Sequence, residues 1–114
     1  MRSIVAEFLE VAALSLDNAM VLERLQGTGR LTTRTARDMR VVGLVARARG
    51  IDANARRDAP FAAYAGLQVQ VPAYHTGNVW ARTMVRLDEA RESARQPLVL
   101  GQRSLARRGI HAPV

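Results

Sequence analysis

The chain has 114 residues, a net charge of +7 and no cysteine. The lack of cysteine excludes disulfides, cysteine-ligated zinc, iron–sulfur clusters and a thiolate nickel site within these residues. No apolar run approaches the ~20 residues of a membrane span, and the first residues lack the apolar stretch of a signal peptide, so we expect a cytoplasmic protein.

All of the basic residues are arginine, and they are scattered along the chain rather than gathered in one block. A basic chain attracts polyanions, but arginine and alanine enrichment without lysine also fits a GC-rich coding sequence. Arginine forms bidentate and partly buried ion pairs well. A segment of a larger complex would therefore carry many arginines whose acidic partners lie elsewhere.

The first predicted element is a helix over residues 3–25, because apolar residues recur there at spacings of three to five. Ser3 is a plausible N-cap, and Gly27 can take the left-handed position that ends the helix. The apolar band is broad, so we expect this helix to be buried on more than one side.

A threonine cap predicts a short helix over residues 33–39, and residues 41–58 are the least regular part, read as an ordered loop. Near its end lies a polar cluster formed by Asp52, Arg56, Arg57 and Asp58. The cluster indicates either an ion-pair lock for the loop or a site that holds an anion or positions a carboxylate.

A second short helix is predicted over residues 61–65, with Pro60 in its first turn. The alternation of apolar and polar residues over 67–71 predicts a β-strand that ends at Pro72. One short strand cannot stand alone, so it needs a pairing partner inside or outside this chain.

The last predicted helix runs from about residue 78 to 96 and should kink or restart at Pro97. Residues 1–106 are predicted to form a single domain, and residues 107–114 a frayed tail. The predicted fold class is therefore mainly α, with two long helices, short helices and one minor β element.

No catalytic constellation is evident. Tyr74 and His75 are adjacent in the loop before the last helix, and such a pair could move protons, although a lone loop histidine is more often solvated. The arginines of the last helix could face nucleic-acid phosphates, but acidic residues interrupt them. We expect no catalytic, cofactor-binding or metal-binding residue in this chain, and no specific nucleic acid as a partner.

An ordered set of short motifs spans residues 17–100 and goes further than composition. These motifs are LERLQGTGRLT (22–32), VGLVARA (42–48), RRDAPFAAY (56–64), TGNV (76–79) and VRLDEARES (85–93). This order resembles the middle of the large subunit of formate-hydrogenlyase-type nickel–iron hydrogenases, and it is similar to the homologous 49 kDa-type subunit of respiratory complex I, which lines the quinone site.

The resemblance implies a scaffold segment of an oxidoreductase subunit, with no activity expected from this chain alone. Nickel–iron or quinone is implied only for an intact parent, whose other subunits would be the partners. The location implied is peripheral on the inner membrane, through those subunits. The alternatives are a self-associating interaction domain, with a homo-oligomer expected of the isolated chain, and a small basic nucleic-acid-binding module.

The positions that match the family are expected to be structural: glycines for turns, two arginines for ion pairs, and a proline and a tyrosine for packing. They are Gly27, Gly29, Gly43, Arg47, Gly50, Arg56, Pro60, Tyr64, Gly77 and Arg82. The chain departs from the family pattern at Leu44, where proline is expected, at Arg49, where a small residue is expected, and at Asn54 and Asn78, where aspartate is favoured. The two asparagines place the family's ion-pair network in doubt.

Overall fold

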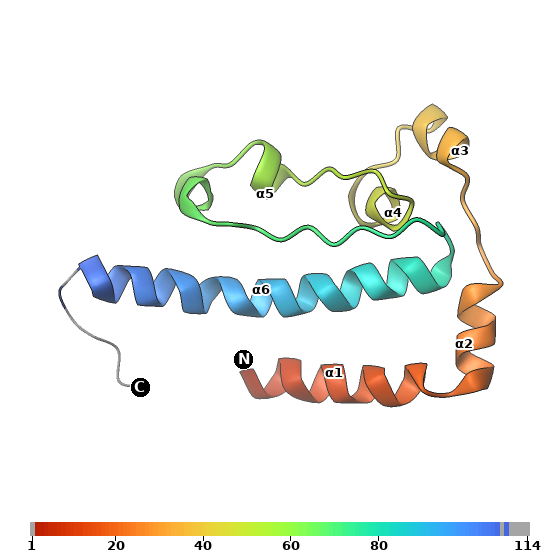
Figure 1. The fold of residues 1–114 in the computed structure, drawn as a ribbon, viewed down its shortest axis with the longest axis horizontal. Coiled ribbons are helices and arrows are strands. Elements are labelled where there is room, and N and C mark those ends of the chain that lie inside the picture. The colour runs from red at the N-terminus through yellow and green to blue at the C-terminus, as the bar shows by residue number, and fades with distance from the viewer. Residues whose placement is uncertain (1, 108, 110–114) are drawn as a thin grey trace.

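The computed structural model describes residues 2–107 and 109. Within them the chain forms six α-helices and one 3-10 helix (Figure 1). These are α1 (Arg2–Leu16), α2 (Ala19–Gln26), α3 (Thr33–Asp38), α4 (Gly43–Ala48), α5 (Ala55–Asp58), the 3-10 helix η1 (Ala62–Gly66) and α6 (Val79–Arg107).

Helix α6 is the central element. It lies between α1 on one side and the α3–η1 region on the other, while α2 closes one end (Figure 1), and it contacts α1, α2 and α4. The molecule is a thin slab of 52 × 34 × 15 Å with a radius of gyration of 17.2 Å. A compact domain of this length has a radius of gyration of roughly 13 Å, so the slab leaves much of its surface open.

The buried apolar core is small. Its centre is Ala48 of α4 packed against Ala81 and Val85 of α6, with Tyr74 and Trp80 beside it. The two aromatic rings meet edge to face, with centroids 5.6 Å apart, the geometry that aromatic pairs prefer. Small residues at the centre let α4 approach α6 closely, but they bury little apolar area.

The single helix predicted over residues 3–25 is wrong in two respects. It breaks at Asp17–Asn18, because the Asn18 side chain accepts hydrogen bonds from the backbone N–H groups of Met20 and Val21 and so caps a new helix, α2. No described residue of α1 or α2 is buried, so the broad apolar band is largely exposed instead of enclosed on more than one side. Gly27 also differs from expectation, since its φ is −87°.

The strand predicted over residues 67–71 does not form; the described residues contain no β-strand. The segment is not hydrogen-bonded to another extended segment. Instead the Gln70 N–H donates to the Glu92 carboxylate at 3.0 Å, and the Gln68 carbonyl accepts from the Arg95 guanidinium at 2.9 Å. Side chains of α6 thus replace the ladder, and the buried side chain of Val69 accounts for the alternating pattern.

The last helix is longer than predicted. It runs from Val79 to Arg107 and continues through Pro97 without a restart. Proline removes one helical hydrogen bond, but Pro97 and Ser93 are both exposed, so the carbonyl that loses its partner can be hydrated. Of the predicted tail, Arg107 belongs to α6, while residues 108 and 110–114 lie outside the described residues. No helix among the described residues is both long and apolar enough to cross a membrane.

Asn78 fixes the start of α6. Its Oδ1 accepts from the Ala81 N–H at 2.9 Å, as an N-cap does, and its Nδ2 donates to the carbonyl of Gln26 at 2.9 Å. We expect Asn78→Ala to lower the free energy of unfolding by about 1–2 kcal/mol, because both bonds are lost. Asn78→Asp should cost less than Asn78→Ala, since aspartate keeps the cap and loses only the bond to Gln26. Urea unfolding followed by circular dichroism measures both; equal losses would show that the cap contributes nothing.

Candidate functional site

A pocket of about 800 Å³ opens between α3, the α3–α4 connection, α4 and α5, with one residue of α6 at its edge. Its lining mixes small apolar side chains with charged ones, and four of the charged ones are arginines. The lining includes Val41, Val42, Ile51, Arg37, Arg40, Arg47, Arg56, Asp58 and Glu89. We call this the arginine pocket.

Arg47 lines this pocket and is 8% exposed. Its guanidinium forms an ion pair with Glu89 of α6 and donates to the carbonyl of Ala53 at 3.1 Å. Its Nε–H is buried and has no hydrogen-bond partner among the described residues. A buried charge needs pairing to offset its desolvation, so the Arg47–Glu89 pair fixes α4 and the following loop to α6.

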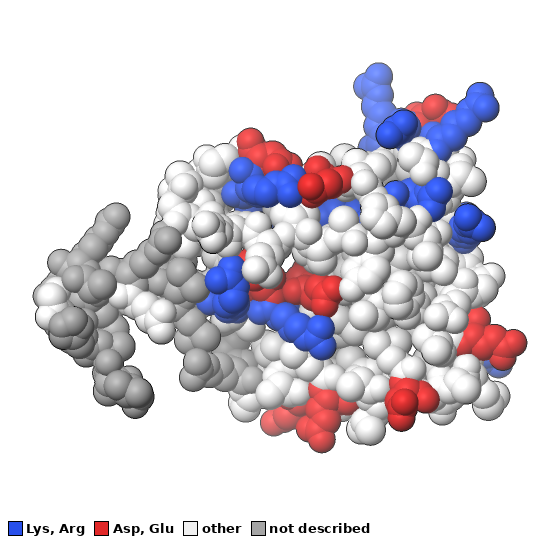
Figure 2. All heavy atoms as spheres, viewed as in Figure 1, with Lys and Arg blue, Asp and Glu red and all other residues white. Residues whose placement is uncertain are grey.

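The other three arginines of the pocket are Arg37, Arg40 and Arg56. None of them forms an ion pair within the described part of the chain. Arg40 adopts a φ of 49°, a left-handed conformation that is uncommon for residues other than glycine. Figure 2 shows blue side chains gathered over α3, beside this pocket.

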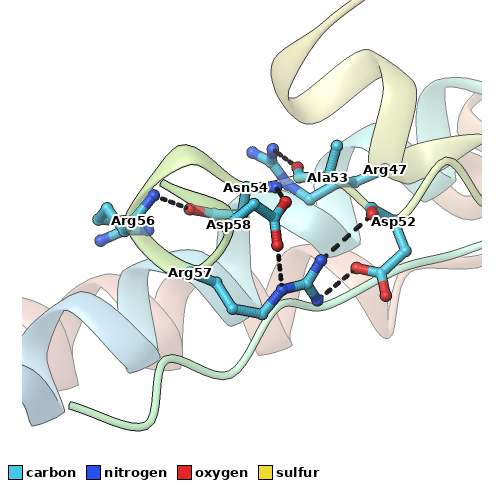
Figure 3. A network of polar contacts seen from close by, with 7 residues as sticks. All are labelled: Arg47, Asp52, Ala53, Asn54, Arg56, Arg57 and Asp58. Carbon is cyan, nitrogen blue, oxygen red and sulfur yellow. Dashed lines mark hydrogen bonds and ion pairs between the residues drawn. The ribbon is translucent and has the colours of Figure 1, made fainter. Parts of the chain in front are cut away.

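The polar cluster predicted at residues 52–58 is an ion-pair arrangement centred on Arg57 (Figure 3). Its guanidinium bonds Asp58 at 2.6 Å and Asp52 at 2.7 Å. Hydrogen bonds to Asp58 and then Asp52 raise the pKa of Arg57 above its usual range, and Arg57 lowers the pKa of Asp58. These contacts are all local, so they lock the loop to α5 but not to other helices, and Arg56 takes no part in them.

A second polar network joins α6 to the extended segment after η1. Glu92 is 6% exposed; its carboxylate accepts from Arg95, from Gln96 and from the Gln70 backbone. The Arg95 hydrogen bond and then the Gln70 and Gln96 donors outweigh burial and lower the pKa of Glu92 to about 2. Sequence reasoning missed this network, because Glu92 and Gln96 read as ordinary surface residues of a helix.

A smaller cavity of about 370 Å³ lies beside that network and is lined by Pro72, Asp88, Arg91 and Glu92 among others. At its edge the Tyr74 hydroxyl donates to Asp88 at 2.5 Å. Burial and then this hydrogen bond raise the pKa of Tyr74 to about 12. A proton relay through Tyr74 and His75 is not supported by the geometry, because Tyr74 bonds Asp88 and His75 is exposed.

Two glycines of the family motif, Gly29 and Gly77, lie together at the start of α6. Gly77 has a φ of 67° and a Cβ there would clash with the Leu31 carbonyl. Its N–H donates to Ala48 and its carbonyl accepts from Leu31 and Arg82. Arg82 also donates twice to the carbonyl of Gly29, which has a φ of 62°. This junction joins the α2–α3 turn to the start of α6.

The predicted site residues therefore fall into separate places. Arg47, Arg56 and Gly43 line the arginine pocket; Gly29, Gly77 and Arg82 form the junction just described. The rest lie apart from both groups. Gly27 caps α2, Gly50 packs against the ring of His75, Tyr64 meets Phe61 with ring centroids 5.5 Å apart, and Pro60 is exposed.

The described residues contain no group of three histidine, cysteine, aspartate or glutamate side chains that could hold a metal ion, and the sequence has no cysteine. The residues present therefore do not fit a thiolate-bound nickel–iron site.

Comparison with known proteins identifies the family. The family model described as respiratory-chain NADH dehydrogenase, 49 Kd subunit, matches residues 1–97. The chain belongs to this family. The resemblance to the 49 kDa-type subunit of respiratory complex I noted in the sequence is thereby confirmed.

Individual relatives agree with the family. The chain is 34% identical over 82 residues to the D subunit of NADH-quinone oxidoreductase from Desulfotalea psychrophila, a match that covers 72% of this chain and 22% of that protein. It is 38% identical over 79 residues to the corresponding D 2 subunit from Sinorhizobium medicae, covering 69% of this chain and 20% of the relative. The chain thus spans about a fifth of the length of these two relatives.

The two departures to asparagine are structurally accommodated. Asn54 caps α5 by accepting from the Arg56 N–H at 3.0 Å, while Asn78 caps α6. Aspartate at either position could cap the same helix. The amide at Asn78 also donates to Gln26, which a carboxylate could not do.

We expect Arg47→Met to lower the free energy of unfolding by about 2–4 kcal/mol, because it leaves Glu89 without its partner. The double variant Arg47→Met/Glu89→Leu should recover at least half of that loss, since no unpaired carboxylate remains. Arg86→Met, at an exposed position of α6, is the control. A double variant less stable than Arg47→Met would contradict the ion pair's role.

The Glu92 network predicts an acid-dependent stability. Because the pKa of Glu92 falls from an ordinary 4.5 to about 2 on folding, its stabilisation is present above about pH 4.5 and is lost as the pH falls toward 2. Its size is about 1–2 kcal/mol, discounted because Arg95 is partly exposed. In denaturant titrations, the free energy of unfolding of the wild-type chain, measured relative to Glu92→Gln, should fall by this amount between pH 4.5 and 2. The exposed Glu23→Gln variant should follow the wild type; a Glu92→Gln curve parallel to the wild type would contradict the assignment.

Proposed function

We propose that this chain is a non-catalytic scaffold segment of an NADH:quinone oxidoreductase-type subunit. The observation that carries the proposal is a set of three polar contacts made by carboxylate side chains of α6. Tyr74 bonds Asp88, Arg47 pairs with Glu89, and Gln70 donates to Glu92. Together they hold the irregular chain between α4 and α6 in one position.

These contacts suit a supporting role because they act on chain that has little secondary structure of its own. Residues 67–78 lack a helix or strand in the described structure, so their position depends on contacts with α6 and on the hydrogen bonds that the Tyr74 and Gly77 N–H groups donate to α4. Hydrogen bonds to charged groups contribute about 1.5–3 kcal/mol each when partly buried. A segment fixed in this way can present a defined surface without contributing a reacting group.

The open shape of the slab also supports a segment that packs against further protein. Exposed large apolar side chains follow one face of α1 at helical spacing: Ile4, Phe8, Val11 and Leu14. Contiguous exposed apolar patches on soluble proteins usually mark interaction surfaces. In the parent assembly this face would be covered by another part of the complex.

For the intact parent we propose a quinone as the electron acceptor in preference to a nickel–iron centre, because the relatives carry the name NADH-quinone oxidoreductase. Its partners would be the other subunits of that complex, and its membrane association would be peripheral, through them. The segment's own contribution is shape and rigidity.

Self-association is a second candidate function, and the exposed α1 face is the observation that favours it. Two copies could bury Ile4, Phe8 and Val11 against each other. Light scattering of the isolated chain at high concentration measures this; a strict monomer would remove this candidate and leave the scaffold proposal untouched.

The scaffold proposal predicts a separation between assembly and catalysis. Affinity-tagged chain, expressed in its native host, should co-purify with identified NADH:quinone oxidoreductase subunits. Glu92→Ala removes the hydrogen bond from Gln70 and the carboxylate that holds Arg95 and Gln96, so the amount of complex recovered should fall by about half or more, while NADH:quinone activity per mole of recovered complex stays unchanged. Glu23→Ala is the matched exposed control. Chain recovered alone from a host whose complex assembles normally, or a fall in activity per complex, would overturn the proposal.

A further inference from the structure

The arginine pocket carries an uncompensated positive charge. Arg37, Arg40, Arg47 and Arg56 line it against two carboxylates, Asp58 and Glu89. Both carboxylates are already engaged, Asp58 by Arg57 and Glu89 by Arg47. The three remaining arginines have no ion pair within the described residues, so the pocket is complementary to a negative group.

The hydrogen-bond donors of Arg47 also indicate a negatively charged ligand. Arg47 lines the pocket, and its buried Nε–H donates to no group among the described residues. A buried donor without a partner costs about 1–3 kcal/mol, and burial of arginine is otherwise offset by full pairing. Here the other nitrogens of the same guanidinium are paired with Ala53 and Glu89, so one N–H of this charged group stays without a partner among the described residues.

The apolar side chains that line the pocket indicate what kind of molecule carries the negative group. Between the arginines lie Ala36, Val41, Ala46, Ile51 and Ala53, and Val42 at the pocket is 82% exposed. Apolar walls favour a ligand that carries aliphatic groups beside its charge. The volume of about 800 Å³ is larger than one side chain and suits a short stretch of polypeptide.

We propose that the arginine pocket binds an acidic side chain flanked by apolar residues, contributed by a partner subunit of the oxidoreductase. The carboxylate would pair with Arg56 and Arg37, and its apolar neighbours would cover Val41, Val42 and Ile51. Arginine suits this role because its planar fork matches a carboxylate with two parallel hydrogen bonds. That the acidic side chain belongs to another oxidoreductase subunit rests on the proposed function. That the pocket binds a carboxylate rests only on its lining residues.

A polypeptide carboxylate fits better than a nucleic acid or a free phosphate. Phosphate backbones are bound by exposed basic surfaces that leave the anion hydrated, whereas Arg47 is buried and aliphatic side chains separate the arginines.

The pocket chemistry is tested on the full chain with a defined probe, the acetylated and amidated peptide Ala-Val-Glu-Leu-Ala, and with its Gln analogue. In nitrogen-15 NMR titrations, the Arg47 Nε–H resonance should shift with the Glu peptide, and the Gln peptide should bind about tenfold more weakly. The variant Arg37→Gln/Arg56→Gln should weaken the Glu peptide by about tenfold. Arg24→Gln/Arg86→Gln removes the same charge at exposed positions outside the pocket and should change affinity less than twofold.

Three results would overturn the pocket assignment: equal binding of the two peptides, equal effects of the two double variants, or a larger Arg47 shift with inorganic phosphate than with the Glu peptide. The source is tested separately by placing a photo-crosslinking residue at Val42 in the native host. Crosslinks to an acidic segment of an identified oxidoreductase subunit support the proposal. Crosslinks only to lipid or nucleic acid, or to no protein while the complex still co-purifies, would overturn the partner but leave the scaffold function standing.

Discussion

The structure depends on contacts between helix α6 and the preceding segment, which has no regular secondary structure of its own. Residues 67–78 form no helix or strand, and fixing each residue costs about 1–2 kcal/mol of conformational entropy. Helix α6 offsets that cost with three neighbouring carboxylates, Asp88, Glu89 and Glu92, each bonded to a different part of the preceding chain. Residues 88 and 92 are one helical turn apart, so these bonds fall within one stretch of α6.

This arrangement explains why so small an apolar core suffices for a defined shape. The centre of the core is Ala48, Ala81 and Val85, whose burial alone yields far less than a typical domain needs. Polar contacts supply specificity of position, and the apolar surface of α1 stays available for other protein. The slab thus combines polar contacts between its elements with an exposed apolar face on α1.

How much the sequence could predict depended on whether the responsible contact was local. The helix at Thr33–Asp38 and the start of α6 near Asn78 were predictable, because their caps lie in the same few residues. The break at Asn18 is also local, but the uninterrupted apolar periodicity around it concealed the cap. The alternation over residues 67–71 suggested a strand because the pattern could not reveal that the partner of Gln70 is a carboxylate on a helix, 22 positions later.

The roles of the arginines could not be predicted either, because their partners lie far away in the sequence. Their scatter along the sequence looked like a bias of composition, yet several bond backbone carbonyls of irregular chain: Arg49 bonds His75, Arg82 bonds Gly29 and Gly77, and Arg95 bonds Gln68. A guanidinium presents five donors in a fixed plane, so one side chain can satisfy two carbonyls, or a carbonyl and a carboxylate, at once. Lysine offers a point charge without that geometry. Where a chain has no sheet or helix to take up its carbonyls, arginine serves as the substitute, and only arginines with no such duty, such as Arg37 and Arg56, remain for a partner.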